Sequence, residues 1–248
     1  MKNSALICTT VFLLLNCSPP ADQKILDKKW LGRSVNFEDI IPAVNTYHMF
    51  DSTRTKVGSM IFGTYFEDGM LVSRDTSQFD DGSVYETASF TLDTGSFTLR
   101  KVNIEMAFTT AKLDIDLERS SGKVVGDYKI TRDTTVNNNP IDSAYMYDVF
   151  REELYMLMHT INFSESDSLN FSALVPTSMS LAKASITYHG EETIEVSTGK
   201  YHCDVLWLKA DGKMPDNKIW IRKDAPRKII KFYVPGPELE IELVAERD

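Results

Sequence analysis

Charged and branched apolar residues alternate with a period of two along much of this chain. The stretch from Glu238 to Leu243 reads Glu-Leu-Glu-Ile-Glu-Leu, and the stretch from Lys112 to Arg119 follows the same rule. Successive side chains of an extended strand point to opposite faces, so each of these stretches has one wet face and one buried face. The pattern predicts antiparallel strands that cover a core on one side only.

Similar stretches recur at short, regular intervals and are separated by turn signals such as Asp80-Asp81-Gly82 and Pro235-Gly236-Pro237. Strands are predicted at 43–66 (two strands), 70–75, 83–92, 97–109, 112–119, 123–132, 168–175, 181–188, 192–196, 201–209, 217–222, 228–234 and 238–243. This spacing is typical of a β meander and not of a fold that alternates strands with helices. The phase of the alternation changes near Arg100 and Lys101, where we expect a β-bulge.

One segment, Asp142 to Ile161, has the period of an α-helix instead. Its apolar residues recur three or four positions apart, and they are Met146, Phe150, Leu154, Leu157, Met158 and Ile161. Asp142 or Ser143 would serve as the N-cap. The patterns together predict a mainly β protein, with a single curved antiparallel sheet and one principal α-helix whose apolar stripe is buried against the concave side of the sheet.

The start of the chain has the features of an export signal. Lys2 precedes a short apolar run from Ala5 to Leu15, whereas a helix that spans a bilayer needs ~20 apolar residues. The segment Leu14-Leu15-Asn16-Cys17 resembles the bacterial lipobox, although Asn16 stands where that motif usually has Gly or Ala. The resemblance implies that Cys17 becomes the lipidated first residue of the mature protein. The alternative is an ordinary signal peptide with a chance cysteine.

These features divide the chain into a lipoprotein signal peptide at 1–16, a lipidated cysteine and tether at 17–30, and a single folded domain at 31–248. The formal net charge is −9, and loss of Lys2 with the signal makes the mature chain one unit more negative. This acidic balance argues against nucleic acid as a partner. Once Cys8 has left with the signal and Cys17 is acylated, Cys203 has no partner for a disulfide, and the strand alternation predicts that it is buried as a small apolar residue.

Candidate catalytic and metal-binding residues do not form a recognisable motif. The four histidines, His48, His159, His189 and His202, lie in separate elements without the spacing of a metal site, and the segment from His189 to Glu192 is interpreted as a charged turn. The chain has no Gly-rich phosphate loop and no GxSxG elbow. We therefore predict a protein that is not an enzyme and uses no metal and no cofactor.

Several motifs in the second half of the chain belong together. They are Gly199-Lys200-Tyr201-His202-Cys203, Trp220-Ile221-Arg222-Lys223-Asp224, Arg227-Lys228-Ile229, Gly236 with Glu242-Leu243, the helix at 142–161 and Leu174-Val175-Pro176. Jointly they resemble the bacterial envelope family known as domain of unknown function 3108. The resemblance implies a fold similar to the periplasmic lipoprotein carrier and its outer-membrane receptor, which is an incomplete antiparallel barrel plugged by a helix. It implies a lipid-anchored location in the cell envelope, at the outer membrane and facing the periplasm, but no established activity.

Two functional hypotheses remain open at this point. The first is a membrane-anchored protein that binds a lipid or another apolar molecule in the concave face, with a candidate cavity lining of Met146, Phe150, Leu154, Leu157 and Met158. The second is an envelope scaffold whose core is fully packed and whose acidic surface binds a protein. An enzyme of envelope maintenance is a third and less favoured hypothesis. The expected partners are therefore the membrane, through the lipid anchor, and an apolar ligand, with no nucleic acid.

Overall fold

The computed structural model describes residues 29–36, 39–164, 167–212 and 214–247. Its strands are β1 (Lys29–Trp30), β2 (Arg33–Ser34), β3 (Ala43–Phe50), β4 (Lys56–Glu67), β5 (Met70–Phe79), β6 (Val84–Asp93), β7 (Thr98–Phe108), β8 (Ala111–Ser120), β9 (Lys123–Arg132), β10 (Thr135–Ser143), β11 (Val149–Phe150), β12 (Ser168–Val175), β13 (Ser180–Val196), β14 (Gly199–Ala210), β15 (Asn217–Arg222), β16 (Ile229–Val234) and β17 (Leu239–Arg247). The helices in these ranges are α1 (Arg151–Leu157) and the short 3-10 helices η2 (Met158–Thr160) and η3 (Pro176–Ser178).

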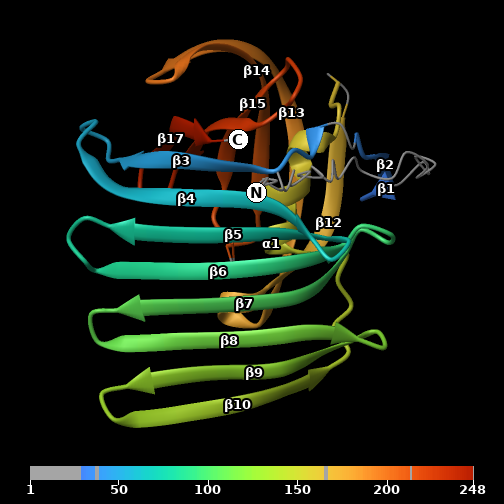
Figure 1. Cartoon of the computed structure of the whole chain (residues 1–248), viewed down its shortest axis with the longest axis vertical. Helices are drawn as coiled ribbons and strands as arrows, with labels where there is room; N and C mark the ends of the chain where they lie inside the picture. Colours follow the sequence, from blue (N-terminus) through green and yellow to red (C-terminus); the bar gives the residue numbers. More distant parts are fainter. Residues whose placement is uncertain (1–28, 37–38, 165–166, 213, 248) are drawn as a thin grey trace, which may run out of the picture.

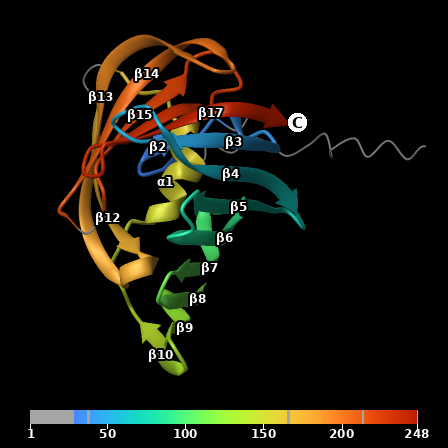
Figure 2. The ribbon, with the colours of Figure 1, turned by 90° about the vertical axis from the view of Figure 1, so that its left-hand side faces the viewer.

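Fifteen strands form one sheet in the order β10-β9-β8-β7-β6-β5-β4-β3-β17-β16-β15-β14-β13-β12-β11, and β1 pairs with β2 beside it. Neighbours in the large sheet are antiparallel except β11, which is parallel to β12. Strands β3 to β10 form a broad layer, and the later strands curve over one side of it with α1 in the concave space (Figures 1 and 2). The outermost strands, β10 and β11, do not pair with each other, so the sheet stays open. The predicted fold class, a single curved antiparallel sheet that forms an incomplete barrel around one principal helix, is confirmed.

The alternation in the sequence corresponds to one buried face. In β8, Leu113, Ile115 and Leu117 are buried, whereas Asp116 and Glu118 are exposed. The expected bulge also occurs, because Thr91 pairs with Lys101 and Leu92 pairs with Leu99, which leaves Arg100 as the extra residue. These local features follow directly from the order of the residues.

The segment from His189 to Glu192 is not a turn between two strands, as the sequence analysis expected. It lies inside β13, where the register against β14 shifts between Tyr188 and Glu191. Gly190 has a φ of 97°, a conformation that residues with a Cβ rarely adopt. The strand therefore bends through a bulge and continues.

The helix is shorter than its apolar spacing suggested, and the prediction of a helix over 142–161 was wrong at its N-terminal end. Residues up to Ser143 belong to β10 and pair with β9, and Val149 and Phe150 pair with β12 before α1 begins at Arg151. Strand pairing satisfies the backbone hydrogen bonds of this segment, and it overrides the helical spacing of a stretch that contains Tyr145, Tyr147 and Val149. Met146 consequently lies outside the helix and is 89% exposed.

The boundary between the tether and the domain also needs correction. Trp30 was assigned to the tether, but it lies in β1, is 3% exposed and belongs to the hydrophobic core. Its Nε1 donates a hydrogen bond to Oε2 of Glu153 in α1 at 3.4 Å, and the other oxygen of Glu153 accepts from the backbone N–H of Leu99 at 3.3 Å. The folded part therefore includes Lys29 and Trp30. Cys17, the signal peptide and the rest of the tether lie outside the described residues.

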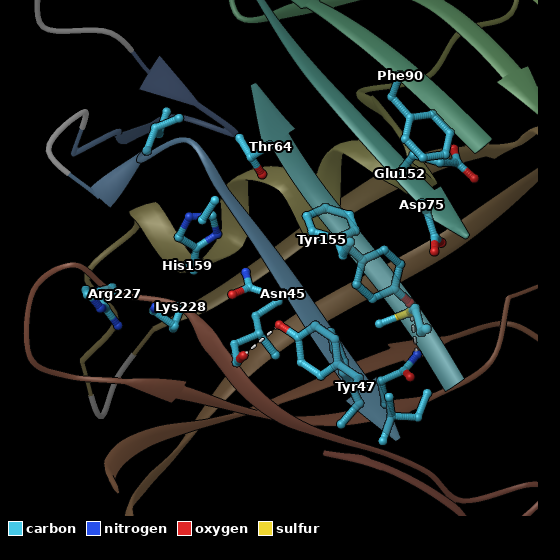
Figure 3. Close-up of a pocket in the computed structure, with 18 of the residues that line it drawn as sticks. Asn45, Tyr47, Thr64, Asp75, Phe90, Glu152, Tyr155, His159, Arg227 and Lys228 are labelled. Atoms are coloured by element: carbon cyan, nitrogen blue, oxygen red, sulfur yellow. Dashed lines mark hydrogen bonds between the residues drawn. The ribbon is translucent and has the colours of Figure 1, made fainter. Parts of the chain in front are cut away.

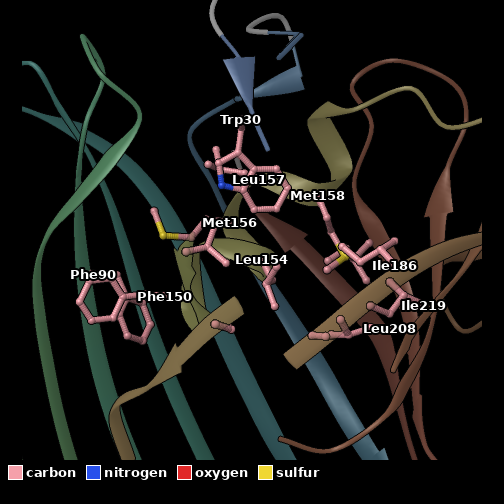
Figure 4. Close-up of a cluster of buried hydrophobic side chains, with 14 of the residues drawn as sticks. Trp30, Phe90, Phe150, Leu154, Met156, Leu157, Met158, Ile186, Leu208 and Ile219 are labelled. Atoms are coloured by element: carbon pink, nitrogen blue, oxygen red, sulfur yellow. The ribbon is translucent and has the colours of Figure 1, made fainter. Parts of the chain in front are cut away.

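One face of α1 and η2 packs into this core (Figure 4). Phe150, Leu154, Leu157 and Met158 are completely or almost completely buried. They belong to the same hydrophobic cluster as Ile186, Leu208 and Ile219 of strands β13 to β15. The helix is thus fixed in the core on this side, and Arg151 and Tyr155 lie on its opposite face.

Candidate functional site

That opposite face borders a cavity of about 240 Å³ between α1 and the early strands (Figure 3). Its wall is mainly apolar and comes from β3, β4, β6, β16 and β17. The main apolar side chains are Tyr47, Met60, Phe62, Phe90, Phe232 and Ile241. Ile41 also lines the cavity and is exposed, which places it at the rim.

Local periodicity explains how these residues come together. Met60 and Phe62 are two positions apart in β4, so both point to the concave face, while Ile61 between them is exposed. In the helical segment, residues four apart share a face, so Arg151, Tyr155 and His159 all line the cavity. Aromatic contacts connect the walls of the cavity. The centroid of the Phe232 ring lies 5.7 Å from the ring centroid of Tyr155 and 6.1 Å from that of Tyr47.

Charged side chains gather at one end of the cavity. Asp75 of β5, Glu86 of β6 and Glu152 of α1 line it together with Arg151. Burial raises the pKa of Asp75 and that of Glu152 to about 7, and it also raises the pKa of Glu86. The guanidinium of Arg151 opposes this rise at each carboxyl but does not cancel it.

A second polar group closes the cavity near the end of the helix. The Arg227 guanidinium donates to Oδ2 of Asp204 at 2.6 Å and to the Ile161 carbonyl at 2.7 Å, and the Arg227 backbone N–H donates to Oδ1 of Asp39 at 2.8 Å. His159 packs beside them, and burial lowers its pKa to about 4, so its ring is neutral at pH 7. The charged groups at this end are paired, which suits a structural role.

Four buried polar atoms of the residues that line the cavity have no hydrogen-bond partner among the described residues. They are Oδ1 of Asn45, Nε of Arg151, Oε2 of Glu152 and Nε of Arg227. Glu152 is only 7% exposed. A buried polar atom without a partner costs ~1–3 kcal/mol, so such atoms mark a place where a ligand or water completes the bonding.

The residues that the sequence analysis assigned to the cavity lie elsewhere. Phe150, Leu154, Leu157 and Met158 pack into the core, Met146 is exposed, and none of the five lines the cavity. The apolar stripe of the helix was correctly read as buried, but the cavity lies on its polar side. Arg151, Glu152, Asp75 and Glu86 carried no signal, because charged residues on a helix or a strand usually face solvent.

The remaining candidates for chemistry are isolated. Cys203 is completely buried and unpaired, and burial raises the pKa of its thiol to about 12, which confirms the predicted apolar role. In the part of the chain that the structure describes, no three or more His, Cys, Asp and Glu side chains are grouped so that they could hold a metal ion. No helix in the same ranges is both long and apolar enough to cross a membrane.

The fold and the cavity define a class of protein: an open, curved β-sheet that wraps a helix and encloses a mainly apolar space. A family model described as "Protein of unknown function (DUF3108)" matches residues 61–243. The chain therefore belongs to this family, as its motifs suggested. No curated protein matches the sequence.

Similar solved structures include two bacterial proteins. A beta-barrel-like protein of domain of unknown function DUF1849 from Brucella abortus superposes with a TM-score of 0.52 at 9% identity, over 84% of this chain and 97% of that one. The hypothetical lipoprotein YmcC from Escherichia coli gives a TM-score of 0.33 at 10% identity, over 84% of this chain and 86% of that one. The first similarity supports the barrel-like fold, and at these identities neither bears on function.

Proposed function

We propose that this protein is a lipid-anchored protein of the bacterial cell envelope that binds an apolar ligand, such as a lipid, in the cavity beside α1. The observation that carries the proposal is the cavity itself. A space of about 240 Å³, lined by aromatic and aliphatic side chains on a curved sheet, is the kind of site that apolar ligands occupy.

The same observation favours a binding protein over a scaffold. The scaffold hypothesis requires a concave face that is fully packed, and packing in protein interiors leaves few voids larger than a water molecule. Here only one face of the helix is packed in this way. The other face borders open space and carries unpartnered polar atoms.

The proposed location rests on the N-terminal sequence. Acylation of Cys17 would hold the domain at a membrane, and a tether of about a dozen residues would leave the cavity close to the lipid surface. An outer-membrane position that faces the periplasm is part of the proposal, as the resemblance to the lipobox and to the envelope family implies.

Binding can be tested directly on the purified full-length chain. We expect native mass spectrometry and organic extraction to recover a bound apolar molecule, and an apolar fluorescent probe to bind and be displaced by lipid. Phe62→Asp places a charge in the cavity wall and should abolish probe binding, because burial of an unpaired carboxylate is costly.

The matched control is Ile61→Asp, which introduces the same charge at the neighbouring exposed position of β4. This variant should bind the probe as the parent does, and circular dichroism establishes that both variants are folded. A parent protein that carries no ligand and binds no probe would contradict the proposed function.

A further inference from the structure

The charged end of the cavity has an arrangement that an apolar ligand alone does not explain. Three separate elements contribute one carboxylate each: Asp75 from β5, Glu86 from β6 and Glu152 from α1. Asp75 and Ser77 share a face of β5, and Ser77 is the cross-strand partner of Glu86, so Asp75 and Glu86 are diagonal neighbours on the concave side. Glu152 approaches the same end from the helix (Figure 3).

Positive charge is in deficit here. Arg151 is the one cation that faces these three carboxylates among the described lining residues, since Arg227, Lys228 and His159 lie at the other end. Arg151 interacts electrostatically with Glu152 and Glu86 and is hydrogen-bonded to Tyr155, while its Nε has no hydrogen-bond partner among the described residues. With all three acids ionised, this end of the cavity would carry an excess of two negative charges.

Hydrogen-bond donors are also lacking at this end of the cavity. Asp75 accepts one hydrogen bond, from the Ser77 hydroxyl at 3.0 Å, while Oε2 of Glu152 is buried and accepts none. Asn45 offers a further carbonyl oxygen, Oδ1, that is also without a partner. The free groups are therefore mostly acceptors, and what they lack is a donor that carries positive charge.

The chemistry of that donor is constrained. The carboxylates are not grouped closely enough for a metal site among the described residues. A primary ammonium group is a compact cation with three N–H donors, so it can bridge acceptors that are too far apart to share one metal ion. An apolar chain attached to it would lie along the wall formed by Tyr47, Met60 and Phe62.

We propose that the cavity selects amphiphiles with an ammonium head group, which Glu152, Asp75 and Glu86 bind while the apolar chain fills the rest of the space. This inference rests on the proposed function and specifies the class of its ligand. Arg151 then limits the negative charge of the empty site and disfavours a head group with more than one positive charge.

The test uses three probes that share one chain and differ in the head group: decylammonium, decanol and decanoate. Each displaces an apolar fluorescent probe from the full-length chain in nanodiscs at pH 7.5, with empty nanodiscs subtracted. We expect decylammonium to bind at least about tenfold more tightly than decanol, because its ammonium group can form charge-assisted hydrogen bonds with the carboxylates, and decanoate to bind most weakly.

The variant Glu152→Gln combined with Asp75→Asn keeps the size of both side chains and removes two charges. It should lose the preference for decylammonium over decanol, and circular dichroism establishes that it is folded. Glu118→Gln, an exposed carboxylate on β8, is the matched control and should keep the preference.

The outcomes separate the two proposals. Displacement by none of the three probes would overturn the proposed function itself. Equal displacement by all three would overturn the ammonium inference and leave an unselective apolar site. Tightest binding of decanoate would also overturn the inference, because Arg151 would then be the group that binds the head.

Discussion

Residues at the start of α1 have separate roles in stability and in ligand binding. Phe150 lies on the packed side, where its ring is 4.9 Å from that of Tyr147 in a T-shaped contact. Glu152 lies on the cavity side, almost as deeply buried but without a partner for one oxygen. Phe150, the last residue of β11, and Glu152, in the first turn of α1, are thus close in sequence but have different roles.

Phe150→Ala should destabilise the protein by ~3–5 kcal/mol, because it removes a fully buried ring and leaves a cavity in the core. Binding of an apolar probe should change little, since Phe150 does not line the binding space. Met146→Ala, at an exposed position, should stay within ~0.5 kcal/mol. Chemical denaturation and probe titration of both variants check this, and a small loss for Phe150→Ala would mean that the ring is not part of the core.

Glu152 should also make stability depend on pH. Its folded-state pKa of about 7 exceeds its ordinary value of 4.5, so the folded protein holds this proton more tightly than the unfolded chain does. The stabilisation is complete below pH 4.5 and is lost as the pH rises to 7. Glu152→Gln cannot lose a proton, so its stability relative to the parent should increase over this range, by at most ~1.4 kcal/mol per pH unit.

Other groups contribute to the pH profile of both proteins. Asp75 acts in the same direction as Glu152, whereas the lowered pKa of His159 makes stability rise between pH 4 and 6.5. The difference between variant and parent removes these shared effects. The free energy of unfolding of Glu152→Gln relative to the parent should therefore rise with pH, and a difference that does not change with pH would refute the raised pKa.

Among the elements, the turn between β15 and β16 has a structural role that its sequence does not reveal. Arg227 in this turn is 5% exposed and joins β14, through Asp204, to the segment after η2, through the carbonyl of Ile161. Its backbone also holds Asp39, just before β3. One side chain and its peptide thus connect three parts of the chain that are distant in sequence.

Arg227→Ala should cost ~3–5 kcal/mol, because the Asp204 carboxylate would remain buried without its cation. The Asp204→Ala change should also destabilise, and the double variant should cost less than the sum of the two single changes. Arg132→Ala, at an exposed site at the end of β9, should have almost no effect. Thermal and denaturant unfolding of the four variants would measure the coupling, and strict additivity would contradict it.

At the scale of the whole molecule, an open sheet stays soluble only if its concave face is covered. Here the helix and the later strands cover it in part, and the remaining space forms the cavity. A protein that takes an apolar ligand from a membrane into such a space benefits from being held close to that membrane. The proposed anchor at Cys17 would provide this.

Cys17→Ala should therefore leave a protein that no longer fractionates with membranes in a host that processes lipoproteins. Acyl chains contribute ~0.8 kcal/mol per buried methylene, and no helix in the described ranges could replace them by crossing the bilayer. The neighbouring change Ser18→Ala should leave membrane recovery unchanged. Equal recovery of the two variants would end the proposal of a lipid anchor.

The sequence by itself determined most of the strands, the bulge at Arg100, the buried role of Cys203 and the buried stripe from Phe150 to Met158. These features depend on local periodicity, which fixes the faces of an element regardless of what lies opposite. The family motifs added the open barrel. All of this could be predicted because each feature is encoded within a few consecutive residues.

The tertiary structure decided what covers each face. Arg151 and Glu152 form the polar side of a helix, which usually faces water, but here β3 to β6 enclose it and turn it into the wall of a cavity. Pairing with β9 places Asp142 and Ser143, the first residues of the predicted helix, in β10, and Met146 is exposed. Trp30 is buried in the core and donates a hydrogen bond to Glu153. These outcomes depend on contacts between residues far apart in sequence, because burial is set by the neighbour across the space and not by the period of the chain.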